Sequence, residues 1–192
     1  PLEMTVAGKN QIKLSDILVG EVWVCSGQSN MQWTVNAAND PDLEKGTAKY
    51  PKIRMINFPQ TGSQEAIWTH DRKWMVCSPE TVGSFSAVGY FFARQLHQTL
   101  DVPIGMVNNA WGGSACEAWI NRDTLKSDGR FKNLMERWTK SEEDFKNLSA
   151  MAVPEDEAKK KDHQAKLKNM TGQMSGNQRP ANIYNGVLKS HL

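Results

Sequence analysis

The chain has 192 residues, a formal net charge of +2 and a hydrophobic fraction of 39%. That length suffices for one domain with a proper core. The near-neutral charge, with no basic tract interleaved with aromatic residues, argues against nucleic-acid binding. No apolar run approaches a membrane span and no signal peptide is visible. Because the first residue is Pro1, we expect a processed or truncated piece of a longer sequence.

Three widely spaced cysteines, Cys25, Cys77 and Cys116, form no CxxC pair. This spacing argues against a zinc site, so we predict neither a metal nor a cofactor. Each cysteine lies in or beside an apolar run, where a buried free thiol is the default expectation. The sequence leaves open whether two of them form a disulfide.

The first half of the chain reads mainly as strands. Alternating apolar and polar positions in 3–7 and 11–18, around a turn at 8–10, predict a hairpin, which we interpret as the end of a preceding β segment covering 1–20. Residues 22–25 read as a central strand. We expect a loop with one helical turn at 36–51, a loop at 59–72, a strand at 52–58, and a short strand at 73–77 at an edge of the sheet.

The strongest helical pattern lies at 84–100. Phe85, Val88, Phe92, Leu96 and Leu100 recur at spacings of three and four, which predicts one buried face. We expect the helix to begin near Thr81 or Gly83 and to end at Asp101 or Pro103. The next strand, 104–107, is apolar on both sides, as in a parallel sheet buried between helices. The order strand, helix, strand predicts an α/β fold with a parallel sheet.

Residues 121–172 are rich in charged side chains. They predict two helices, roughly 123–149 and 155–170, which we interpret as a charged helical insertion over the core. A loop follows at 171–180, and 181–192 starts another element.

The stretch 22–33, VWVCSGQSNMQW, contains the candidate catalytic residue of the chain. A short β-prone run is broken by Ser26 and Gly27, after which a helix can start. A serine on such a strand-to-helix turn, Ser29, can point its Oγ outward beside backbone N–H groups that stabilise an oxyanion. The alternative is an ordinary cap and turn.

A second stretch, 103–120, ends its strand at Gly112 and Gly113. Glycine suits a backbone that must approach a substrate closely, and it equally suits a plain tight turn. We expect Asn109 and Ser114 to satisfy this turn and cap the next helix. Among the tryptophans, Trp23 and Trp74 are expected in the core. Trp33, Trp111 and Trp119 flank the motifs and either line a pocket or pack in the core.

The segments 16–33, 103–120 and 183–192 resemble the sialate O-acetylesterase family of SGNH (GDSL-type) hydrolases. The resemblance implies a three-layer α/β/α sandwich with a parallel sheet, here a partial domain at 21–192 that is incomplete at its C-terminus. It implies metal-free removal of O-acetyl groups from carbohydrates such as sialic acid. By motif, Ser29 is the nucleophile and one donor of the oxyanion hole, and Gly112 or Gly113 supplies the second donor. Gln28, Gln32 and Trp111 are proposed to contact the substrate.

Two further family segments are absent, a Gln-Gly-Glu block and the Asp-x-x-His segment that supplies the base. None of the four histidines, His70, His97, His163 and His191, has that context, and His70 is the least implausible substitute. Serine attack needs an oriented base, so we expect the chain alone to be inactive and the remainder of its catalytic domain to be its partner.

Two other functions stay open: a non-catalytic glycan-binding module and an acetylxylan-type esterase. A secreted or periplasmic location is expected, or a lysosomal one in a eukaryote.

Overall fold

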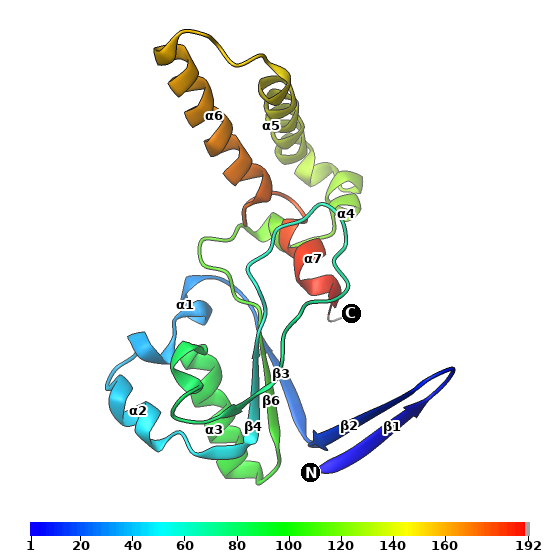
Figure 1. Cartoon of the computed structure of the whole chain (residues 1–192), viewed down its shortest axis with the longest axis vertical. Helices are drawn as coiled ribbons and strands as arrows, with labels where there is room; N and C mark the ends of the chain where they lie inside the picture. The colour runs from blue at the N-terminus through cyan, green and yellow to red at the C-terminus, as the bar shows by residue number, and fades with distance from the viewer. Residues whose placement is uncertain (191–192) are drawn as a thin grey trace. The chain divides into compact units, whose positions relative to one another are not determined.

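The computed structural model describes residues 1–190 and divides them into two compact units (Figure 1). Unit 1 comprises residues 1–58 and 71–112, and unit 2 comprises residues 59–70 and the described chain from Gly113 onward. The elements of unit 1 are β1 (Leu2–Ala7), β2 (Gln11–Ile17), β3 (Glu21–Cys25), α1 (Ser29–Gln32), α2 (Pro41–Thr47), β4 (Tyr50–Asn57), β5 (Met75–Cys77), α3 (Ala87–Leu100) and β6 (Ile104–Asn108). Unit 2 contains α4 (Arg122–Ser127), α5 (Lys132–Ala150), α6 (Glu157–Ser175) and α7 (Asn182–Gly186).

The main sheet of unit 1 has the strand order β3-β6-β4-β5. The first three strands are parallel and in register, so that Cys25 pairs with Asn108 and Asn108 with Asn57 at their carboxyl ends. The predicted α/β class is confirmed. The sheet is mixed rather than wholly parallel, because the short edge strand β5 runs antiparallel to β4.

The core of unit 1 lies between this sheet and α3. Ile53 and Met106 on the sheet and Tyr90 on the helix are fully or almost fully buried. The helix begins later than predicted, because the Ser86 side chain caps it by accepting a hydrogen bond from the Gly89 N–H at 3.1 Å.

The predicted buried face of this helical segment is confirmed only in part: Phe85 is fully buried just before α3, and Leu96 packs against the core. Ala87, Tyr90 and Ala93 face the core, whereas Val88, Phe92 and Leu100 are 40 to 51% exposed. The small residues Ala87 and Ala93 let the helix lie close to the sheet on either side of the fully buried Tyr90.

The strand β3 lies at an edge of the described sheet, so the prediction of a central strand is wrong. Its residues Val22 and Val24 are more than half exposed. The expectation that Trp23 and Trp74 lie in the core is wrong as well, since both are more than 40% exposed. Trp23 packs edge-on against Phe92, and its strand has no neighbour on the outer side of the described sheet.

The predicted N-terminal hairpin is confirmed as the antiparallel pair β1–β2. Its register places Met4 opposite Leu14 and Val6 opposite Ile12, so that one face of the hairpin is apolar. All four side chains are more than 40% exposed.

Unit 2 is built around the helical hairpin of α5 and α6 (Figure 1). The helix expected at 123–149 is broken in two, because the Asp128 side chain accepts a hydrogen bond from the Arg130 N–H and starts a new turn. The second helix extends to Ser175, beyond the predicted end. From the middle of α5, the Glu142 carboxylate binds Arg122 at 2.8 Å and Arg179 at 2.9 Å.

Candidate functional site

The carboxyl ends of β3 and β6 carry two loops that run side by side in unit 1. The Asn109 N–H donates to the Cys25 carbonyl at 3.1 Å, and the Trp111 N–H donates to the Gly27 carbonyl at 2.9 Å. Neighbouring parallel strands bring their carboxyl ends to the same edge of a sheet, so the two sequence motifs meet there. This edge is where α/β sheets bind ligands.

The first loop reverses at Gly27, whose φ is +128°. This region of backbone conformation is open to glycine and costly for other residues. The chain then enters α1, and the residue after it is held against α3, since the Trp33 carbonyl accepts a hydrogen bond from the Ala87 N–H at 2.7 Å. The turn that carries Ser29 is therefore fixed at both ends.

Ser29 is the first residue of α1 and is exposed. Gly112 lies directly beside it. A Cβ added to Gly112 would lie 3.5 Å from the Ser29 Cα and 3.6 Å from its Cβ. The structure thus brings together the predicted nucleophile and a glycine of the second motif, which are more than 80 positions apart in the chain.

Gln32 lies between these two loops. Its side-chain oxygen accepts a hydrogen bond from the Gly112 N–H at 2.5 Å. Gln32 is half-buried, whereas Gln28 is exposed and makes no capping bond to α1. Of the two glutamines predicted to contact a substrate, Gln32 has a defined partner within the protein.

Asn109 is a residue whose role the sequence reasoning misjudged. Its side chain is only 4% exposed, and neither its amide nitrogen nor its amide oxygen has a hydrogen-bond partner among residues 1–190. The expectation that it satisfies the turn is wrong. Its neighbour Asn108 does that instead, by accepting a hydrogen bond from the Ala110 N–H at 3.2 Å. A buried carboxamide without partners is costly and marks a place where water or a ligand group can bind.

The tryptophans that flank the motifs differ in environment. Trp111 is half-buried, and Trp33 is 57% exposed with its indole N–H bound to the Ala37 carbonyl at 2.7 Å. In unit 2, the Trp119 indole donates to the Ser114 hydroxyl at 3.0 Å, so Ser114 does not cap the following helical turn as expected.

Gly113 also belongs to unit 2. Its φ is +72°, which favours glycine in a left-handed turn.

No histidine in the described part of unit 1 is placed to activate Ser29. His97 is at the far end of α3, and its Nδ1 contacts the Val102 carbonyl at 2.8 Å, just before β6 begins. The amino end of β6 is opposite the edge that carries Gly112. His70 and His163 are part of unit 2, and His191 lies outside the described residues.

The thiol that precedes the turn is not a competing nucleophile. Cys25 is buried, and this burial raises its pKa to about 11. A thiol needs to be ionised in order to attack, so Cys25 stays unreactive near neutral pH. Ser29 is the exposed hydroxyl beside Gly112.

Within residues 1–190, no group of three or more His, Cys, Asp or Glu side chains is arranged to hold a metal ion. Over the same residues, every helix is too short or too polar to span a bilayer.

Comparison with known proteins identifies the family. The model of the family described as carbohydrate esterase, sialic acid-specific acetylesterase, matches residues 19–177. The chain belongs to this family. The sialate O-acetylesterases of Rattus norvegicus and Homo sapiens are each 37% identical over 127 residues, or 62% of this chain. A crystal structure of a carbohydrate acetylesterase from Xanthomonas citri aligns with a TM-score of 0.62 and 37% identity over 66% of this chain.

The match covers 23% of the rat protein, 24% of the human protein and 29% of the Xanthomonas citri chain. The chain thus spans about a quarter of the length of the curated members of the carbohydrate esterase family that it matches. The predicted family is confirmed, and both motifs lie inside the matched range.

Proposed function

We propose that this chain carries the nucleophile of a carbohydrate O-acetylesterase and that Ser29 is that nucleophile. The observation that supports the proposal is the close approach of Gly112 to Ser29 at the carboxyl edge of the sheet, where a Cβ added to the glycine would lie 3.5 Å from the Ser29 Cα. An exposed hydroxyl beside close-packed backbone amides is what acyl transfer requires. The family and its named relatives indicate acetylated sugars, sialic acids among them, as the substrate class.

In the proposed mechanism, the Ser29 Oγ attacks the acetyl carbonyl carbon while a base takes the hydroxyl proton. The oxyanion is held by the Ser29 N–H and by a glycine N–H of the second motif. The sugar oxygen leaves with a proton, and water then releases acetate from the acetylated Ser29.

The base belongs to a segment outside unit 1 in this proposal, since His97 is at the wrong end of β6. We infer that the remainder of the catalytic domain supplies it. A serine without its base loses several orders of magnitude in rate. Acetylated glycans are met mainly outside the cytoplasm, so we propose a secreted, periplasmic or lysosomal location.

The test compares aryl acetate hydrolysis by the complete protein with that of its Ser29→Ala and Ser26→Ala variants. Ser26 is the matched control, because it is an exposed serine on the same turn. We expect Ser29→Ala to lose about 10³-fold or more in kcat and Ser26→Ala to stay near the original rate. Equal rates of hydrolysis in Ser29→Ala and the unmodified protein would show that Ser29 is not the nucleophile.

A further inference from the structure

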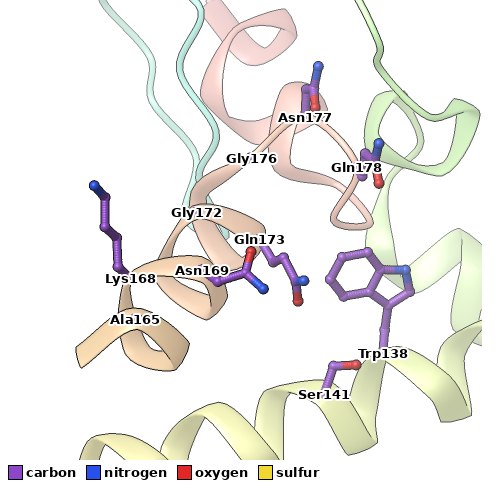
Figure 2. Close-up of a pocket in the computed structure, with 10 residues that line it drawn as sticks. All are labelled: Trp138, Ser141, Ala165, Lys168, Asn169, Gly172, Gln173, Gly176, Asn177 and Gln178. Atoms are coloured by element: carbon purple, nitrogen blue, oxygen red, sulfur yellow. The ribbon is translucent and has the colours of Figure 1, made fainter. Parts of the chain in front are cut away.

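A second cleft lies entirely within unit 2, between α5 and α6 (Figure 2). Its volume is about 740 Å³, within the range of small-molecule sites. Trp138 and Ser141 on α5 extend toward Asn169 and Gln173 on α6, and Gln178 closes one end. None of these residues belongs to the Ser29 site.

The face of α6 that borders this cleft has an unusual composition for a helical hairpin. Ala165, Asn169, Gly172 and Gln173 follow the spacing of one helix face, and Gly176 comes directly after the helix ends. A helix that packs on a partner normally places large apolar residues there. Small residues and carboxamides leave space instead of filling it, so this face of α6 keeps the cleft open.

Gly172 shows this most directly. A Cβ added to Gly172 would meet no atom within 4 Å. Glycine inside a helix costs about 1 kcal/mol relative to alanine. Packing against α5 does not require a glycine at this position. The absence of a side chain at Gly172 keeps the space of the cleft open.

The polar groups of the cleft match the hydroxyls of a sugar. The carboxamides of Asn169, Gln173 and Gln178 make no hydrogen bond with any other described residue, and all three are exposed. Each offers both donors and an acceptor, as a sugar hydroxyl requires. The Ser141 hydroxyl donates to the Arg137 carbonyl at 3.1 Å and offers its oxygen as an acceptor.

The indole of Trp138 supplies the apolar surface on which the C–H face of a pyranose ring can stack. Among the ten residues that line the cleft, the one charged residue is Lys168, whose ammonium group extends away from Trp138 (Figure 2). The recognition chemistry is therefore that of an uncharged ring.

We propose that this cleft is a second carbohydrate site, which binds a pyranose unit of the glycan by stacking on Trp138 and by hydrogen bonds to the carboxamides. The assignment goes beyond the esterase function and depends on it only for the choice of glycans to be tested. Such a site would bind the glycan through a sugar ring, independently of the acetyl group.

The test measures saturation-transfer NMR between the 192-residue chain and two probes, sialyllactose and xylotetraose. We expect transfer to ring protons of at least one probe, and binding about tenfold weaker or lost in Trp138→Ala. Gly172→Leu fills the cleft while raising helix propensity, so its loss of binding is not a folding failure. Gly46→Leu is the matched control, because Gly46 also lies in a helix with no atom within 4 Å of an added Cβ.

No transfer to either probe, or equal transfer in Gly172→Leu and Gly46→Leu, would overturn the proposal. Ser29→Ala keeps this cleft and is expected to bind the probes as the unmodified chain does. Loss of hydrolysis in the complete protein carrying Ser29→Ala, with glycan binding retained in the 192-residue chain carrying the same change, separates the two proposals, and either one can fail without the other.

Discussion

The side-chain oxygen of Gln32 accepts a hydrogen bond from the backbone N–H of Gly112 at 2.5 Å. This bond ties the end of α1, which follows β3, to the loop that follows β6. It holds Gly112 beside Ser29, and it occupies the one donor that the Gly112 backbone provides. Gln32 is therefore a positioning residue in our account.

The first prediction separates an anchoring role of Gln32 from direct contact with substrate. Gln32→Glu keeps an acceptor oxygen at the same reach, so we expect kcat for aryl acetate in the complete protein to stay within about threefold. Gln32→Ala removes the acceptor and should lower kcat about tenfold, with about 1 kcal/mol less stability. The reverse order, with Glu more harmful than Ala, would show that Gln32 does not anchor this loop.

A second prediction concerns the unpaired carboxamide of Asn109. Asn109→Leu replaces two unsatisfied buried groups with apolar ones, so the free energy of unfolding should stay level or rise by about 1 kcal/mol. In Asn108→Leu, the same change breaks bonds to Asn57 at 2.9 Å and to Ala110 at 3.2 Å, and should cost about 1–3 kcal/mol. Urea unfolding of both variants measures the difference.

Equal losses of stability in the two asparagine variants would mean that the Asn109 side chain already makes hydrogen bonds to bound water. That result would contradict the inference that its carboxamide is free to bind a ligand group. A gain in stability accompanied by slower ester hydrolysis in Asn109→Leu would instead mark a side chain retained for function.

A third prediction tests how closely α3 approaches the strand that leads to Ser29. A Cβ at Gly89 would lie 2.6 Å from the Cys25 Sγ, so Gly89→Ala should destabilise unit 1 by about 1–3 kcal/mol despite better helix propensity. Gly46→Ala, where the space is open, should stabilise the protein by about 0.8–1 kcal/mol.

The double variant Gly89→Ala with Cys25→Ala removes the clashing sulfur. We expect it to lose less than the sum of the two single changes, since the residues are in contact. Strict additivity in thermal unfolding would contradict the close contact.

The fourth prediction concerns the buried thiols. Burial raises the pKa of Cys25 to about 11 and of Cys77 to about 12, above the ordinary value of 9.0. Both thiols are protonated in the folded and unfolded states below pH 9, so their contribution to stability is fully present there. Between that pH and the folded pKa values, only the unfolded state loses these protons, and the free energy of unfolding falls as pH rises.

Urea unfolding midpoints near pH 8 and near pH 10 measure this loss. Replacing Cys25 and Cys77 with alanine should flatten the pH dependence, whereas replacing Cys116, which is exposed, should leave it unchanged. Near pH 8 a thiol reagent should label Cys116 in the folded chain and reach the other two only on unfolding. Fast labelling of Cys25 in the folded chain would contradict its burial.

Local patterns in the sequence were sufficient for the α/β class, the hairpin at β1–β2, the strand β6, the helix α3 and the turn from strand to helix that precedes Ser29. Such features depend on neighbouring residues: alternation along a strand, helical spacing, and glycine at a sharp turn. The family resemblance rests on the same short segments, and the match over 19–177 confirmed it.

Features that depend on residues far apart in the chain required the tertiary structure. The edge position of β3, the exposure of Trp23 and the inner face of α3 follow from which strand pairs with which, and a single strand does not encode its neighbours. The bond between Gln32 and Gly112 and the unpaired Asn109 arise only where two loops meet. Local structure depends on residues that are close in the sequence. Contacts between distant residues depend on how surfaces pack and which hydrogen bonds form in the folded protein.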